Sequence, residues 1–137
     1  GTGGARPWNL VSNVTKLLRR DESHAFRDIA DRPIETPAMA WSYALVLGLD
    51  PEAASGIVSI EVAVEVMDGK LGIAVAGTDP SRFCAPERSL AAMPLGQRIV
   101  VAAKAADIRF LVFRNAAADG VRTRFRVLSI EARWRAR

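Results

Sequence analysis

Two aromatic side chains lie two positions apart in the stretch WSYALVLGL, which begins at Trp41. On a strand, Trp41 and Tyr43 project from the same face, because side chains alternate between the two faces of a sheet. Neighbouring aromatic rings on an exposed face form a platform for the apolar CH face of a sugar ring, whose hydroxyls then bind polar side chains beside it. The more common alternative is that both rings belong to the hydrophobic core.

A polar pair, Arg114 and Asn115, follows the apolar run FLVF. An unpaired guanidinium is costly to bury, so Arg114 must reach a partner or the rim of its sheet. Two interpretations fit equally well. The pair binds a carboxylate or the hydroxyls of a sugar, or Arg114 pairs with a carboxylate of the protein itself and caps the end of its strand.

Two carboxylates, Glu61 and Glu65, lie on the polar side of the alternating run IVSIEVAVEVM. Four residues of strand separate them by about 13 Å, which is wider than the carboxylate spacing of glycoside hydrolases. We therefore expect a solvated face that offers carboxylates to a ligand and performs no acid–base catalysis.

Enzyme motifs are absent from the sequence. It has no dinucleotide-binding, P-loop, metalloprotease or nucleophile-elbow pattern, and it holds a single histidine, His24, and a single cysteine, Cys84. One cysteine excludes an internal disulfide and a cysteine-based zinc site, and it favours a reducing, cytoplasmic location. The sequence therefore predicts a non-catalytic protein without a cofactor and assigns no metal-binding residue.

Positive charge is concentrated towards the C-terminus. The chain carries a net charge of +4, whereas residues 110–137 hold seven arginines against two carboxylates, a net charge of +5. The series Arg122, Arg124 and Arg126 would suit a nucleic-acid backbone or an acidic polysaccharide. Charges on an edge strand also prevent aggregation between sheets, and no nucleic-acid-binding motif accompanies them, so we disfavour a nucleic-acid partner.

The elements that must position these residues divide the chain in two. Its 137 residues fit one domain,. Residues 1–36 form an N-terminal segment, with a tag or linker remnant at GTGG and either a short amphipathic helix over about residues 9–20 or irregular structure. Residues 37–137 form the domain proper. No apolar run approaches the roughly 20 residues that cross a bilayer, so we expect no membrane span.

A hairpin is predicted in the stretch VEVMDGKLGIAVAG, because Asp68-Gly69 is a favoured two-residue loop between strands. In that register Val66 faces Leu71, and Glu65 faces Gly72. One face of the hairpin then carries mostly small side chains beside two carboxylates: Glu61, Ala63, Glu65, Gly72, Ala74 and Ala76. Small side chains allow a close approach, and the candidates are a sugar, another sheet or the N-terminal segment.

Further strands follow a proline-bearing crossing over residues 77–97. Residues 98–105 and 107–115 read as strands, and the second is apolar on both faces, which is typical of a central strand. From Val121 onward apolar residues alternate with arginines until the alternation shifts by one position, which implies a β-bulge near Val127 and Leu128. These features predict an all-β fold, an antiparallel β-sandwich with Greek-key or jelly-roll connections.

The segments WSYALVL, VAVEVMDGKLGIAV and FLVFRNAAADGVRTRFRVLSIE, from about Trp41 to Glu131, resemble accessory β-sandwich domains of bacterial FkbM-type methyltransferases and glycosyltransferases. Those domains look like carbohydrate-binding modules. The matching features are Trp41 and Tyr43, the Asp68-Gly69 turn with Gly72, and Arg114-Asn115 before Gly120. The resemblance implies a jelly-roll module that recognises glycan or organises a glycan-processing enzyme, and it assigns no ligand contact to any residue.

Two hypotheses follow. In the first, the protein is a non-catalytic carbohydrate-binding module whose partners are a glycan or polysaccharide and a fused or associated glycan-modifying enzyme. In the second, it is a protein–protein interaction or oligomerisation module, for example a homodimer, with no small-molecule ligand.

Overall fold

The computed structural model describes residues 14–18, 23–24, 33–49 and 56–135. All secondary-structure elements within these ranges are β-strands. In chain order the strands are β1 (Val14–Leu18), β2 (Ser23–His24), β3 (Ile34–Glu35), β4 (Tyr43–Leu49), β5 (Ile57–Asp68), β6 (Lys70–Ala76), β7 (Arg88–Ala91), β8 (Gln97–Lys104), β9 (Phe110–Asn115) and β10 (Arg124–Arg135).

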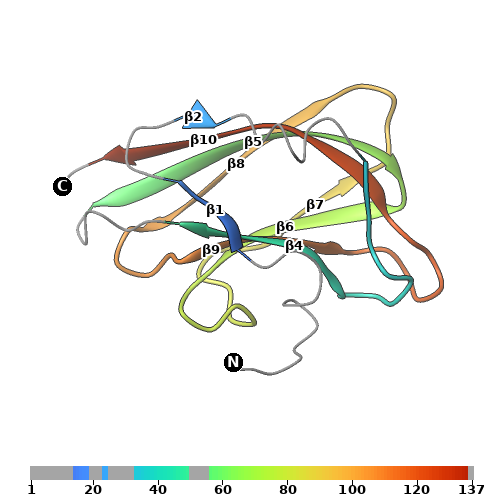
Figure 1. The fold of residues 1–137 in the computed structure, drawn as a ribbon, viewed down its shortest axis with the longest axis horizontal. Helices are drawn as coiled ribbons and strands as arrows, with labels where there is room; N and C mark the ends of the chain where they lie inside the picture. The colour runs from blue at the N-terminus through green and yellow to red at the C-terminus, as the bar shows by residue number, and fades with distance from the viewer. Residues whose placement is uncertain (1–13, 19–22, 25–32, 50–55, 136–137) are drawn as a thin grey trace.

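The strands form two sheets that pack face to face, and Figure 1 shows them as two layers. Sheet A has the order β1-β4-β9-β6-β7, and sheet B has the order β2-β10-β5-β8, with β3 paired to β10. From β4 onward the chain changes sheet at every connection except β6 to β7, as in Greek-key and jelly-roll sandwiches,. The predicted antiparallel β-sandwich is confirmed, and so is the central place of β9 in its sheet.

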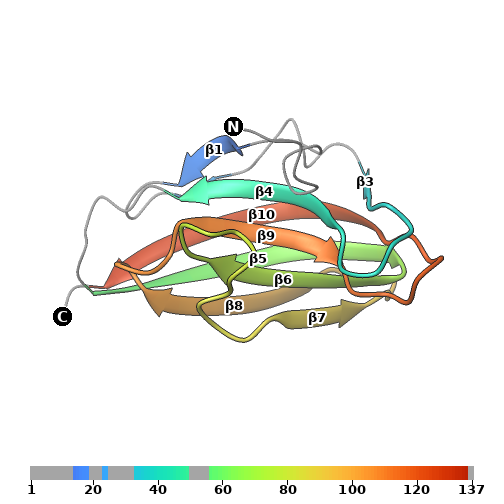
Figure 2. The same ribbon diagram turned by 90° about the horizontal axis from the view of Figure 1, so that it is seen from below.

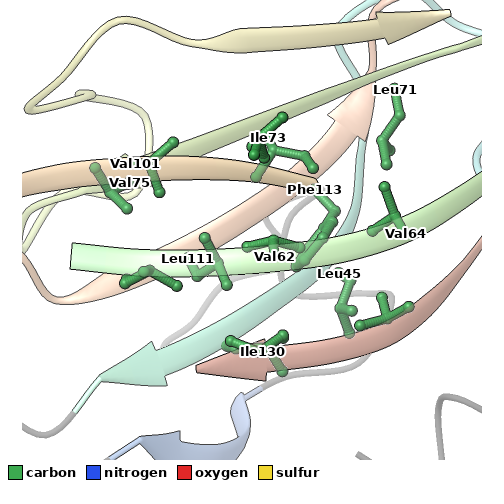
Figure 3. Close-up of a cluster of buried hydrophobic side chains, with 14 of the residues drawn as sticks. Leu45, Val62, Val64, Leu71, Ile73, Val75, Val101, Leu111, Phe113 and Ile130 are labelled. Carbon is green, nitrogen blue, oxygen red and sulfur yellow. The ribbon is translucent and has the colours of Figure 1, made fainter. Parts of the chain in front are cut away.

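The core lies between the two sheets and is built from alternating apolar residues. Strand β5 contributes five fully buried side chains from one face. Figure 3 shows buried side chains of both sheets pointing into the space between them. The rings of Phe113 in sheet A and Phe125 in sheet B stack with their centroids 5.8 Å apart. This contact joins the two layers within the core, where burial of large aromatic side chains contributes strongly to stability,.

The β-bulge predicted in the last strand is confirmed. The register of β10 against β5 shifts between Val127 and Ser129, and the intervening Leu128 is exposed. Val127 and Ile130 are both fully buried. The extra residue therefore lets the apolar side chains before and after the bulge face the core.

The helix predicted over residues 9–20 is wrong for its described part. Val14–Leu18 form β1, which pairs in parallel with the edge of β4. The segment begins with the β-branched residues Val14 and Thr15, which favour extended backbone. An open strand edge offers backbone partners, and this tertiary pairing outweighs the helical spacing of the apolar residues. The rest of that prediction lies outside the described residues.

The predicted hairpin at Asp68-Gly69 is also wrong, because β5 and β6 belong to different sheets. Gly69 has a φ of +81°, as a tight turn requires, but the turn is a corner between layers. The N–H of Lys70 donates to the Thr123 hydroxyl over 3.0 Å, and its carbonyl accepts from the N–H of Ala116 over 2.9 Å. These bonds replace the expected partner, Met67, and turn the chain into sheet A.

The crossing predicted over residues 77–97 is interrupted by a strand. Arg88–Ala91 form β7, which pairs with β6 and is the edge of sheet A. Residues 77–87, which we call the 77–87 loop, therefore connect neighbouring strands of one sheet.

Candidate functional site

Arg114 lies on the outer face of sheet A, directly over a glycine. In β9 the side chains of Leu111 and Phe113 enter the core, so Arg114 projects from the opposite face. Its register neighbour on β6 is Gly72. A Cβ atom at position 72 would collide with the carboxylate of Glu87 and would lie 3.4 Å from Cγ of Arg114. Gly72 is thus required by close approach, and the group that approaches is a side chain of the protein itself.

Glu87 holds Arg114 in a bidentate ion pair. Both Nε and Nη2 of the guanidinium donate to the carboxylate, each over 2.7 Å. The two side chains are only 20% and 16% exposed, respectively. Hydrogen bonding to Glu87 raises the pKa of Arg114 above its ordinary value, so the arginine stays charged. Of the two interpretations of Arg114, pairing with an internal carboxylate is the one that the structure shows.

Two aromatic rings pack against the guanidinium. The Cζ atom of Arg114 lies 4.6 Å from the ring centroid of Trp41 and 4.7 Å from that of Phe83. Both distances are within the range of cation–π attraction. The guanidinium is thus fixed by its hydrogen bonds to Glu87 and by its contacts with the two rings.

Trp41 is an exposed residue outside the core. It precedes β4 and remains 54% exposed. Its φ of +67° is in the left-handed region, which bulky residues rarely adopt,. The backbone N–H of Trp41 donates to the carbonyl of Asn115 over 2.7 Å, which helps to hold this conformation. Strained residues cluster at functional sites, so the geometry singles out this indole.

Tyr43 fastens the 77–87 loop to the outer face of sheet A. Its hydroxyl donates to the carbonyl of Pro80 over 2.7 Å, and its backbone is the register neighbour of Arg114. The loop hangs below sheet A in Figure 1 and passes in front of β9 in Figure 2. Burial raises the pKa of Tyr43, although Arg114 opposes the shift. Tyr43 therefore helps to position the segment that carries Phe83 and Glu87.

Asn115 is buried and serves the fold. Its Nδ2 donates to the carbonyls of Pro37, Met39 and Val121 over 3.1, 3.1 and 2.9 Å. Its Oδ1 accepts from the N–H of Ala117 and lies 2.7 Å from the Thr123 hydroxyl. Because its side chain is engaged with five groups of the protein, the structure does not group Asn115 with Arg114 at the outer face of the sheet.

Glu61 and Glu65 lie on the other side of the molecule, on the outer face of sheet B. Glu61 forms an ion pair with Arg98 at 3.0 Å, and Glu65 forms one with Arg126 at 2.8 Å. Because β5 and β6 belong to different sheets, the predicted patch that joined these carboxylates to Gly72, Ala74 and Ala76 does not exist. Ala74 and Ala76 are fully buried on sheet A.

The structure thus brings together Trp41, Tyr43 and Arg114, and it adds Phe83 and Glu87, which the sequence did not single out. Both additions come from the 77–87 loop, where no periodicity predicts the path of the chain. A partial signal existed: a charged residue in a central strand requires a carboxylate, and a glycine beside it leaves room for one. We call Trp41, Phe83, Glu87 and Arg114 the Arg114 site.

The chemistry available at the Arg114 site is binding by stacking and hydrogen bonding. In the ranges that the structure describes, no group of three histidine, cysteine or acidic residues is arranged to hold a metal ion. Burial raises the pKa of Cys84, which disfavours the thiolate that a nucleophile requires,. Among the residues that the structure describes, there is no helix long and apolar enough to cross a membrane.

Neither a scan against protein-family models nor a comparison with curated protein sequences finds a match to this chain.

Proposed function

We propose that this domain is a non-catalytic carbohydrate-binding module whose ligand binds at the Arg114 site. The observation that carries the proposal is the exposed indole of Trp41, held in a rare backbone conformation against a fixed guanidinium–carboxylate pair. An exposed ring beside immobilised polar groups is the combination that sugar recognition needs, because it joins an apolar face to directional hydrogen bonds.

The polar groups of the site match the hydroxyls of a sugar. A hydroxyl both donates and accepts, whereas an ionised carboxylate only accepts and a guanidinium only donates. Glu87 uses two of the five guanidinium donors, and none of the described residues accepts from Nη1 of Arg114. Vicinal hydroxyls can therefore bridge the carboxylate and the guanidinium, while the CH face of the sugar lies on Trp41.

The biological role that we propose with this binding is an accessory one. The module would hold a glycan near a glycan-modifying enzyme that is fused to it or associated with it. The proposal rests on the pattern of the strands and of Trp41, Tyr43 and Arg114, which resembles accessory domains of such enzymes.

Calorimetric titration with an oligosaccharide panel tests the proposed function. We expect at least one oligosaccharide to bind, and Trp41→Ala to weaken its binding by about tenfold, the loss of one stacking contact. The matched control is Val100→Ala, which removes an exposed apolar side chain from β8 in sheet B and should leave the affinity unchanged. Absence of binding across the panel, or equal losses in the two variants, contradicts the proposal.

A second candidate function, protein–protein interaction, is favoured by an exposed apolar cluster at sheet B. Met93, Leu95 and Leu128 are exposed, Leu95 at 70%. A Cβ atom at Gly96 would lie 3.2 Å from Leu128, which places the 93–96 segment beside the bulge of β10. If this cluster joins two copies of the chain, light scattering will show a dimer that Leu95→Asp dissociates. A monomer at all concentrations contradicts a homodimer.

A further inference from the structure

We infer that the Arg114 site selects neutral sugars and discriminates against uronic acids and other anionic sugars. The inference rests on the proposed function and specifies its ligand class. An arginine in a binding site ordinarily suggests an acidic ligand, because a guanidinium matches a carboxylate with two parallel hydrogen bonds. Three features of this site indicate the opposite.

The first feature is that the guanidinium already makes two aromatic contacts within the protein. Its Cζ atom lies 4.6 Å from the ring centroid of Trp41 and 4.7 Å from that of Phe83. These contacts compete with stacking of the guanidinium on a ring of the ligand. What Arg114 offers a ligand is the N–H groups of its edge that Glu87 does not use.

The second feature is that the charge of Arg114 is already neutralised. Glu87 occupies the bidentate edge with two bonds of 2.7 Å, and it is itself largely shielded from solvent. A ligand carboxylate would either displace Glu87 or lie beside it, and two carboxylates in close contact repel each other. Displacement would leave the shielded carboxylate of Glu87 without its ion-pair partner. The free-energy cost of that unpaired charge is larger than the gain from a new, solvent-exposed ion pair.

The surrounding charges do not compensate. The 77–87 loop carries Asp79, Arg82 and Glu87, so the loop and Arg114 together have two positive and two negative residues. Arg82 lies 3.9 Å from Asp79 and is exposed, so it is already near a carboxylate. The net charge of these four residues is zero, and the carboxylate of Asp119, which accepts from the N–H of Ala40 beside Trp41, adds a negative charge, so the surroundings give no attraction to an anion.

The third feature is the exposed ring. The face of an indole carries negative electrostatic potential, which attracts polarised C–H groups and repels a carboxylate. A neutral pyranose presents C–H groups to Trp41 and hydroxyls to the ion pair. A uronate of the same shape brings a negative charge against both the ring and Glu87.

Matched pairs of oligosaccharides test the inference. Titrations in low salt would compare manno-, galacto- and gluco-oligosaccharides with mannurono-, galacturono- and glucurono-oligosaccharides of equal length. We expect each neutral ligand that binds to bind at least tenfold more tightly than its uronate counterpart. Uronates that bind as tightly as their counterparts, or more tightly, overturn the inference but leave the proposed function intact. If no sugar of either kind binds, the proposed function fails.

The variant Glu87→Gln assigns the discrimination to its cause. Glutamine keeps the size and one acceptor of the side chain but removes its charge, so the positive charge of Arg114 is no longer balanced. We expect the preference for the neutral member of a pair to fall at least threefold, with circular dichroism confirming that the variant is folded. An unchanged preference in the folded variant contradicts the role of Glu87. If the variant does not fold, the comparison in the wild-type protein still decides the inference.

Discussion

At the scale of single residues, Gly72 and the Arg114–Glu87 ion pair depend on each other. The carboxylate lies over the α-carbon of the glycine, in space that any other residue would fill. Trp41 packs against the same guanidinium, and Tyr43 is the register neighbour of Arg114 on β4. The properties of Arg114 therefore depend on the residues that surround it on this face of the sheet.

Substitution of Gly72 by alanine should destabilise the protein by about 1–3 kcal/mol, because the new methyl group overpacks the ion pair. The same substitution in a Glu87→Ala background should cost clearly less, because its main collision partner is then absent. Urea denaturation of the two single variants and the double variant gives the coupling free energy of this cycle. Additive effects would show that Glu87 does not lie over Gly72 in solution.

Because of the Tyr43 hydroxyl, the free energy of unfolding should decrease as the pH rises into the alkaline range. Burial raises the pKa of Tyr43 in the folded state, so the folded protein retains the proton more strongly than the unfolded chain. This contribution is fully present below the ordinary tyrosine pKa of about 10 and is lost as the pH rises through the raised value.

The variant Tyr43→Phe isolates that contribution. At neutral pH it should lose about 1 kcal/mol of stability, the value of one hydrogen bond. Between about pH 9 and 11 its stability should fall less steeply than that of the wild-type protein, as measured by denaturation at each pH. Parallel pH profiles would contradict the raised pKa and the bond to Pro80.

Sequence reasoning at this scale identified Arg114 but not its partner. The need for a partner follows from the energetics of burying a charge, which hold for any fold. The identity of Glu87 depends on where an irregular loop crosses the sheet, and no periodic pattern encodes that path. The sequence pairs Asn115 with Arg114 because the two residues are adjacent, whereas the burial of Asn115 is evident only from the loops packed around it.

At the scale of elements, the turn at Asp68-Gly69 shows that alternation predicts which residues face the core but not which sheet a strand joins. The inward positions of β5 and β6 were predicted correctly, and all of them are buried. Alternation states which side of a strand faces the core, but two strands can cover a core from the same sheet or from opposite sheets. The choice is made here by Thr123, whose hydroxyl accepts from the N–H of Lys70.

Asn115 joins the loops at the end of sheet A, and its removal should be among the most destabilising substitutions. Asn115→Ala removes five side-chain hydrogen bonds at once, to Pro37, Met39, Ala117, Val121 and Thr123, so we expect a loss of about 3 kcal/mol or more,. The matched control is Ser42→Ala, whose exposed hydroxyl makes one bond to the carbonyl of Met39 and should cost less than about 1 kcal/mol,. Similar urea midpoints for the two variants would contradict the conclusion that the hydrogen bonds of Asn115 hold these loops together.

At the scale of the whole molecule, the two candidate surfaces lie on opposite layers. The Arg114 site is on sheet A, whereas Glu61, Glu65 and the cluster around Leu95 belong to sheet B. The fold class was predictable because alternating strands and proline-bearing crossings favour a sandwich. The opposition of the two surfaces was not, since it follows from the pairing of distant strands. We therefore expect Leu95→Asp to leave sugar affinity unchanged, and titration of this variant would show it.

The most direct test of the central claim is chemical-shift mapping by NMR with a neutral oligosaccharide that binds. If the Arg114 site is the ligand site, the largest changes will fall on the indole N–H of Trp41, the side-chain Nε–H of Arg114 and the backbone of Phe83 and Glu87. Changes confined to β5, β8 and β10, or equal changes in the Trp41→Ala variant, would contradict the account and move any binding to sheet B.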